Sequence, residues 1–138
     1  MGTTSISQFQ ALFQEKTSTI EEAYEFMLAY AAQGKSREDQ SVSPSIRTFL
    51  ENTLQAIEDL QGHFALVQQE SELQQEVLEA CAIFLEDARK TRALLRLAIS
   101  TNNITSQMVD NLNASIHIRA MLTDIFVIDE FLDIQAQA

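Results

Sequence analysis

The feature that most constrains the fold is the scarcity of residues that end a helix or form a tight turn. The chain of 138 residues contains three glycines and one proline, whereas a sandwich or barrel of many short strands needs frequent turn residues. The long segments between them carry apolar side chains three and four positions apart, the spacing of one face of a helix. The sequence therefore predicts an all-α protein.

Four helical segments of similar length are expected. Gly34 is expected to end the first, because glycine readily adopts the left-handed conformation that follows many helices. Ser43 and Pro44 are typical of a helix start and begin the second segment, and a capping-box pattern at Ser71 begins the third. The polar turn 100–103 precedes the fourth, which is expected to reach about Ile134. Short turns between such helices favour an antiparallel up-down-up-down four-helix bundle, in one domain spanning residues 1–138.

The first segment contains one interruption. Its apolar stripe lacks a member at Lys16, and Ser18 and Glu21 have the spacing of a capping box. The pattern predicts either one helix that is kinked near Ser18 or two shorter helices that are broken there.

The charge of the chain limits its partners. Its formal net charge is −11, whereas nucleic acid and anionic membranes both attract a basic face. No apolar stretch is long enough to span a bilayer, and the first residues lack the basic and apolar regions of a signal peptide. Cys81 is the single cysteine, so no intrachain disulfide is expected. These features predict a cytoplasmic protein that binds neither nucleic acid nor membrane.

No residue pattern of an enzyme is present. The sequence has no glycine-rich phosphate loop, no nucleophile elbow and no pair of cysteines. Without a Glu-x-x-His motif it lacks the usual di-iron signature of helical bundles, so neither a metal nor a cofactor is expected.

The two histidines are His63 and His117. An accessible His63 would suit a histidine phosphotransfer protein, but a histidine at the boundary of the core is the simpler interpretation.

Arg89, Arg92 and Arg96 share one edge of the third segment. Such a row can bind an anion or an acidic partner through forked hydrogen bonds. Alternatively, Glu51 and Asp110 neutralise it within the chain. The intramolecular alternative is the preferred hypothesis.

The fourth segment has more apolar surface than one bundle helix needs. At about 100° per residue, two stripes separate onto opposite sides. The first stripe consists of Val109, Leu112, Ile116, Ala120, Val127, Phe131 and Ile134. The second stripe begins halfway along and consists of Ile118, Met121, Ile125, Ile128 and Leu132. Either can face the core, and the other then requires a cover: a second copy of the chain, a different protein, or half of a broken first helix.

We expect the first stripe to face the core and the second stripe to form a protein interface, because large exposed apolar stripes promote aggregation. The expected function is that of a small non-enzymatic interaction or regulatory module, which dimerises through its C-terminal helix and binds a further, unidentified protein. A phosphotransfer protein using His63 and a helical sensor of a small apolar ligand are the alternatives.

Overall fold

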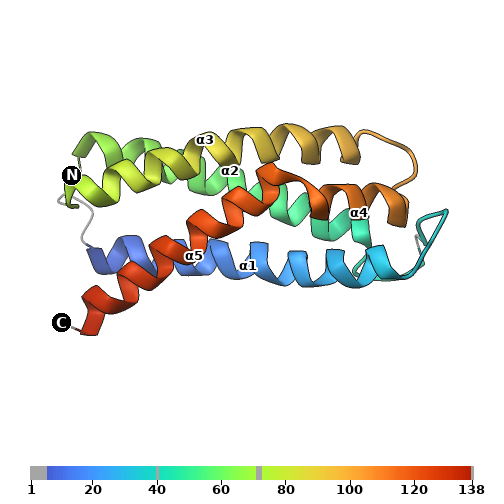
Figure 1. The fold of residues 1–138 in the computed structure, drawn as a ribbon, viewed down its shortest axis with the longest axis horizontal. Coiled ribbons are helices and arrows are strands. Elements are labelled where there is room, and N and C mark those ends of the chain that lie inside the picture. Colours follow the sequence, from blue (N-terminus) through green and yellow to red (C-terminus); the bar gives the residue numbers. More distant parts are fainter. Residues whose placement is uncertain (1–5, 40, 71–72, 138) are drawn as a thin grey trace.

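The computed structural model describes residues 6–39, 41–70 and 73–137, and five α-helices account for most of them (Figure 1). They are α1 (Ile6–Ala32), α2 (Ile46–Glu70), α3 (Gln75–Ile99), α4 (Ser106–Ala114) and α5 (Ile116–Gln137). The described part of the chain contains no β-strand, so the prediction of an all-α protein is confirmed. The capping-box residues Ser71 and Glu72 lie outside the described residues.

The helices α1, α2 and α3 run alternately along the long axis of the molecule, α4 returns along it, and α5 continues in the general direction of α4 but crosses obliquely (Figure 1). Each long helix packs against its neighbour in sequence: α1 against α2, and α2 against α3. The predicted fourth helix is divided in two, and its parts have different neighbours. The short α4 packs mainly against α1, whereas α5 packs mainly against α3. The expected count of four helices is therefore wrong by one.

The first helix is continuous, so the alternative of two shorter helices that are broken near Ser18 is wrong. Thr17, which is 3% exposed, completes the apolar stripe between Phe13 and Ile20. The Lys16 ammonium lies 3.0 Å from a carboxylate oxygen of Asp59 on α2. Lys16 therefore lies at the α1–α2 boundary without interrupting the helix, while Ser18 is an exposed residue in its middle.

The chain changes direction at Ser115, between α4 and α5. Ser115 has an extended backbone conformation (φ −62°, ψ 129°), and its N–H bonds the Leu112 carbonyl oxygen at 3.0 Å. Its Oγ accepts a hydrogen bond from the His117 N–H at 3.2 Å, which makes Ser115 a capping residue for α5. Two side chains anchor the break: Asn113 Nδ2 donates to the Met27 carbonyl oxygen at 3.1 Å, and Thr91 Oγ1 donates to that of His117 at 3.1 Å.

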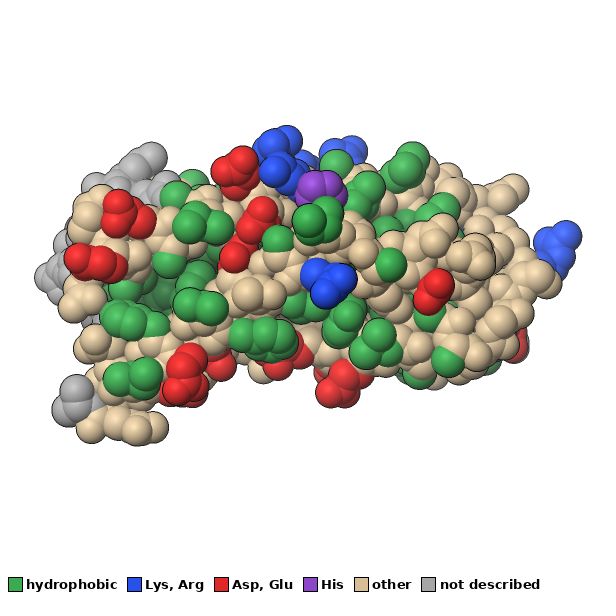
Figure 2. All heavy atoms as spheres, viewed as in Figure 1, with side chains coloured by type: hydrophobic (Ala, Val, Ile, Leu, Met, Phe, Trp, Pro, Cys, Tyr) green, Lys and Arg blue, Asp and Glu red, His purple; other side chains and the backbone are tan. Residues whose placement is uncertain are grey.

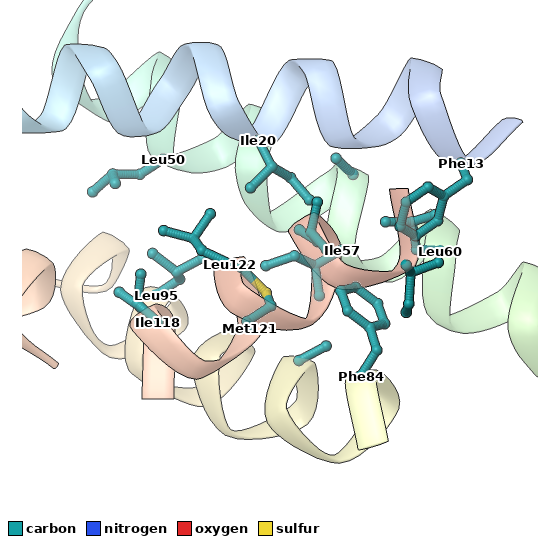
Figure 3. Close-up of a cluster of buried hydrophobic side chains, with 14 of the residues drawn as sticks. Phe13, Ile20, Leu50, Ile57, Leu60, Phe84, Leu95, Ile118, Met121 and Leu122 are labelled. Carbon is teal, nitrogen blue, oxygen red and sulfur yellow. The ribbon is translucent and has the colours of Figure 1, made fainter. Parts of the chain in front are cut away.

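The core is one continuous set of apolar side chains from all five helices. Its aromatic part joins Phe9 and Phe13 of α1 to Phe64 of α2, with ring centroids 5.3 to 6.0 Å apart. Phe84 of α3 meets Phe64 edge-on at 5.3 Å. Further along the molecule, Ile118, Met121 and Leu122 of α5 lie among aliphatic side chains of the other helices (Figure 3).

Hydrogen bonds fasten the two longest connections to each other. Gly34, with a φ of 64°, follows the end of α1, which confirms its predicted role. Beyond it, the backbone N–H of Lys35 donates to Ser106 Oγ at 2.8 Å, and the backbone N–H of Ser106 donates to the Lys35 carbonyl oxygen at 2.9 Å. The Tyr30 hydroxyl donates to the Ile104 carbonyl oxygen at 2.6 Å. This end of the molecule is consequently well ordered by polar contacts.

Candidate protein-interaction site

The chain itself covers the five residues that we expected to form an interface. Ile118, Met121, Ile125, Ile128 and Leu132 are each at most 3% exposed. They pack towards the core of the same chain, where Figure 3 labels Ile118 and Met121 beside Leu95. A residue covered in this way cannot contact a partner, so the expectation that the second stripe is the interface is corrected. The first stripe of α5 is the uncovered one.

The break at Ser115 explains this exchange of stripes. In α4, Val109 and Leu112 of the first stripe are buried. The extended backbone of Ser115 then changes the phase of the helix, so that α5 buries the second stripe instead. Ile116, Val127 and Ile134 of the first stripe are 73%, 63% and 57% exposed. The first stripe therefore packs into the core in α4, and the second stripe packs into the core in α5.

We call the solvent-facing row of α5 its outer face. Its members are Ile116, Arg119, Ala120, Thr123, Val127, Glu130 and Ile134. Phe126 and Phe131 flank it on the two sides, the first exposed and the second partly buried against the core. Of the nine large apolar side chains that are exposed among the described residues, five lie on α5 or on the neighbouring edge of α3: Ile83, Ile116, Phe126, Val127 and Ile134. The apolar surface is thus concentrated rather than scattered.

A hollow continues this surface from α5 onto α3. Because α5 crosses the molecule obliquely (Figure 1), its C-terminal half leaves a depression beside the start of α3. One part, of about 120 Å³, is lined by Ala80, Val127 and Phe131 with Glu76, Val77 and Ile128. A second part, also about 120 Å³, adds Ile83 and Asp124. Hydrophobic side chains surround the hollow in Figure 2.

Acidic residues border α5 on both sides. Asp124 faces α3, and burial together with the nearby Asp87 carboxyl raises its pKa to about 7. On the other side, Asp129 faces α1, where burial first and then Asp129 raise the pKa of Glu21. Gln10 Nε2 donates to Asp133 Oδ1 at 3.2 Å. Of these carboxyls, that of Asp133 lies near the C-terminus of α5, where the backbone dipole disfavours negative charge.

The arginine row is partly neutralised, but by a different residue from those expected. Arg92 Nε donates to Glu58 Oε2 at 2.9 Å, because antiparallel packing of α2 and α3 places Glu58 opposite it. Within the described residues, neither Glu51 nor Asp110 forms an ion pair with the row. Arg89 and Arg96 are exposed and have no ion-pair partner there.

His63 has the position of a boundary residue. Its ring stacks on Phe9 with centroids 5.6 Å apart, and burial lowers its pKa. Its Nε2 is enclosed and has no hydrogen-bond partner among the described residues. An enclosed Nε2 does not favour the phosphotransfer alternative, which requires an accessible imidazole.

Two further features of the described residues bear on chemistry, the Cys81 thiol and the placement of side chains that could bind a metal ion. Cys81 is fully buried, and burial raises the pKa of its thiol to about 12. No group of three or more His, Cys, Asp or Glu residues in the described ranges is placed to hold a metal ion. A search of the same ranges found no helix that is both long and apolar enough to cross a membrane.

One pocket in the interior of the described residues is small. The pocket that lies between α1, α2, α3 and α5, beside Met27, Thr91 and Met121, has a volume of about 10 Å³. Such a volume holds at most about one water molecule. A larger depression of about 470 Å³ lies at the surface, where its lining includes Lys35, Ser106 and Asp110.

Comparisons of the chain with models of protein families, with curated protein sequences and with solved structures found no significant match. The candidate site is accordingly defined by its own geometry: an exposed apolar row on α5, a neighbouring hollow on α3 and an acidic border. Sequence reasoning missed Arg119 and Glu130 within this site. The sequence alone could have drawn attention to Arg119, because it is the last basic residue of the chain.

Proposed function

We propose that the protein is a small, non-enzymatic, cytoplasmic interaction module, which binds a helix of another polypeptide chain on the outer face of α5 and the adjoining hollow of α3. The single observation that carries this proposal is the concentration of exposed apolar side chains on that face. Concentrations of exposed apolar side chains of this kind often mark sites where a protein binds a partner. In this proposal α4 and α5 together are the broken fourth helix of an up-down-up-down bundle, which forms one domain.

The chemistry of the face suits a helical partner. A ridge of apolar side chains at helical spacing next to a hollow can receive the side chains of a second helix. Both a second copy of the chain and a different protein can supply that helix. The partly buried Phe131 and the exposed Val127 line the same part of the hollow, so they are the expected anchors.

Two alternative functions have less support. A phosphotransfer protein requires an accessible imidazole, whereas the Nε2 of His63 is enclosed. A sensor of apolar ligands requires a cavity, whereas the interior pocket beside Met121 measures about 10 Å³.

The test compares Val127→Asp with Leu66→Asp. Both replace an exposed aliphatic side chain by a carboxylate, but Leu66 is on α2, away from the face. The mass of each protein is measured by light scattering across a concentration range, and bound proteins are recovered from cells that express each tagged variant. We expect Val127→Asp to lose self-association or a stoichiometric bound protein, and Leu66→Asp to retain it.

The proposal is wrong if wild type neither self-associates nor retains a protein that depends on Val127. Circular dichroism of both variants shows whether each remains folded. Ile134→Ser is a second, milder variant for the case in which Val127→Asp unfolds.

A further inference from the structure

The outer face of α5 has an approximate mirror order along its length. Ile116 and Ile134 are equally far from position 125, and so are Thr123 and Val127. Arg119 precedes position 125 by six residues and Glu130 follows it by five. Read from either end towards the middle, the face therefore presents first an isoleucine and then a charged residue. The two charged residues have opposite signs.

Opposite signs at opposite ends are what an antiparallel copy of the same helix requires. We propose that the partner on this face is a second copy of the chain, with its α5 antiparallel to the first about a two-fold axis near position 125, so that Arg119 of each copy pairs with Glu130 of the other. This inference rests on the proposed interaction function and specifies its partner. An interface of this kind is self-complementary, as two-fold dimers demand.

The geometry permits the proposed pairs. With position 125 on the axis, Arg119 and the opposing Glu130 differ by one residue along the helices, or about 1.5 Å. At about 100° per residue, Arg119 and Glu130 lie about 20° apart on the same flank of α5. In an antiparallel two-fold pair, residues on the same flank face each other. Helix axes about 8–10 Å apart leave a gap that the long arginine and glutamate side chains can span.

Both charged side chains are available for such pairing. Arg119 and Glu130 are exposed, and neither forms an ion pair with another described residue of its own chain. Arg119 is also the single basic residue of α5, which carries four acids. The antiparallel arrangement thus places Arg119 opposite an acid of the other copy rather than opposite the second Arg119.

The pairs also address the overall repulsion between copies. Each chain has a formal net charge of −11, so two copies repel each other at low ionic strength. In a parallel arrangement Glu130 would meet Glu130. The antiparallel arrangement replaces this contact by two attractive pairs, while Ile116 of each copy covers Ile134 of the other.

The edge of α3 widens the interface. Ile83 lies beside Asp124 and Val127 at the hollow, and Val127 is near the proposed axis. The Ile83 side chains of the two copies consequently approach each other across the axis. This contact adds apolar area to a ridge that α5 alone presents, as stable interfaces require.

The experiment is a charge exchange. The dissociation constant of the dimer is measured by sedimentation equilibrium for wild type, Arg119→Glu, Glu130→Arg and the double variant. We expect each single variant to weaken association about tenfold, because two like-charge contacts arise per dimer. The double variant is expected to return to within about threefold of wild type, because the pairs are restored with reversed direction.

Matched controls separate local pairing from net charge. Arg89→Glu and Glu22→Arg change the net charge by the same amounts at exposed positions on α3 and α1 away from the face, and we expect them to alter the dissociation constant less than threefold. A double variant no tighter than its single variants would overturn the antiparallel arrangement, even if Val127→Asp still dissociated the dimer. A wild-type chain that is monomeric at 100 µM would overturn the second copy as partner, and the proposed function would then depend on a different bound protein.

Discussion

Arg47 and Glu38 form a two-pronged ion pair: Arg47 Nη2 donates to Glu38 Oε1 at 2.7 Å, and Nε donates to Oε2 at 3.1 Å. The Glu38 side chain is 3% exposed, and its Oε1 also accepts the Ile104 N–H at 2.7 Å. Arg47 further donates to the carbonyl oxygens of Ile99 and Thr101. This pair therefore joins the α1–α2 connection to the end of α3 and the start of the α3–α4 connection.

Glu38→Gln is expected to lower the free energy of unfolding by about 2–3 kcal/mol, because removal of one member of a buried pair leaves the other charge uncompensated. Urea unfolding followed by circular dichroism measures the change. Asp39→Asn is the control: Asp39 is exposed and accepts hydrogen bonds from Ser41 alone among the residues described. Equal losses in the two variants would contradict the structural role of the pair.

Asp124→Asn is expected to raise stability at pH 8 and to have no such effect near pH 4. Burial and the neighbouring Asp87 raise the pKa of Asp124 in the folded protein from 3.8 to about 7. Because the pKa of Asp124 is higher in the folded than in the unfolded chain, this group stabilises the fold at pH values below its unfolded pKa. That stabilisation is lost as the pH rises towards 7. With a discount for solvent screening, the gain at pH 8 is about 1 kcal/mol.

Chemical unfolding at pH 4, 6 and 8 provides the measurement. The difference between wild type and Asp124→Asn is expected to grow with pH across this range. The contribution of Glu38 to stability depends on pH with the opposite sign, because its hydrogen bonds from Arg47 lower its pKa. This contribution is therefore present above about pH 4.5 and is lost on acidification. A pH-independent difference for Asp124→Asn would show that Asp124 does not hold its proton in the folded state.

Cys81 is expected to resist thiol reagents until the protein unfolds. Burial excludes the reagent and raises the pKa of the thiol to about 12, and the thiolate is the reacting form. We expect labelling at least about a thousandfold slower than that of an exposed cysteine, since it requires opening of the core. A Leu66→Cys, Cys81→Ser variant supplies the exposed comparison. Rapid labelling of folded wild type would contradict the burial of Cys81.

The sequence was sufficient to predict the helical class because apolar spacing reports directly on helix faces. The stripe residues Phe13, Ile57 and Leu95 are all buried, as their three-four spacing predicts. Gly34 likewise follows the end of α1 with a positive φ. These features depend on neighbours in sequence, so local patterns determine them.

The position of the break and the buried stripe of α5 could not be predicted in the same way. Ser115 is stabilised as a break by contacts with distant residues: Asn113 bonds Met27 of α1, and Thr91 of α3 bonds His117. Without these tertiary contacts, the sequence around Ser115 suits a continuous helix. The choice between two apolar stripes depended on the break, which is why the predicted interface residue Ile125 proved to be a core residue.

Ser115→Ala distinguishes the broken helix from the continuous one by the sign of its effect. Alanine has the higher helix propensity, so in a continuous exposed helix the substitution would stabilise the protein by a few tenths of a kcal/mol. At a capping residue, loss of the hydroxyl that accepts the His117 N–H instead costs about 1 kcal/mol. We expect destabilisation, measured by urea unfolding. Ser18→Ala, at an exposed position inside α1, is the matched control and is expected to be neutral or stabilising. Stabilisation by Ser115→Ala would show that α4 and α5 are one helix and that the buried stripe of α5 must be reassigned.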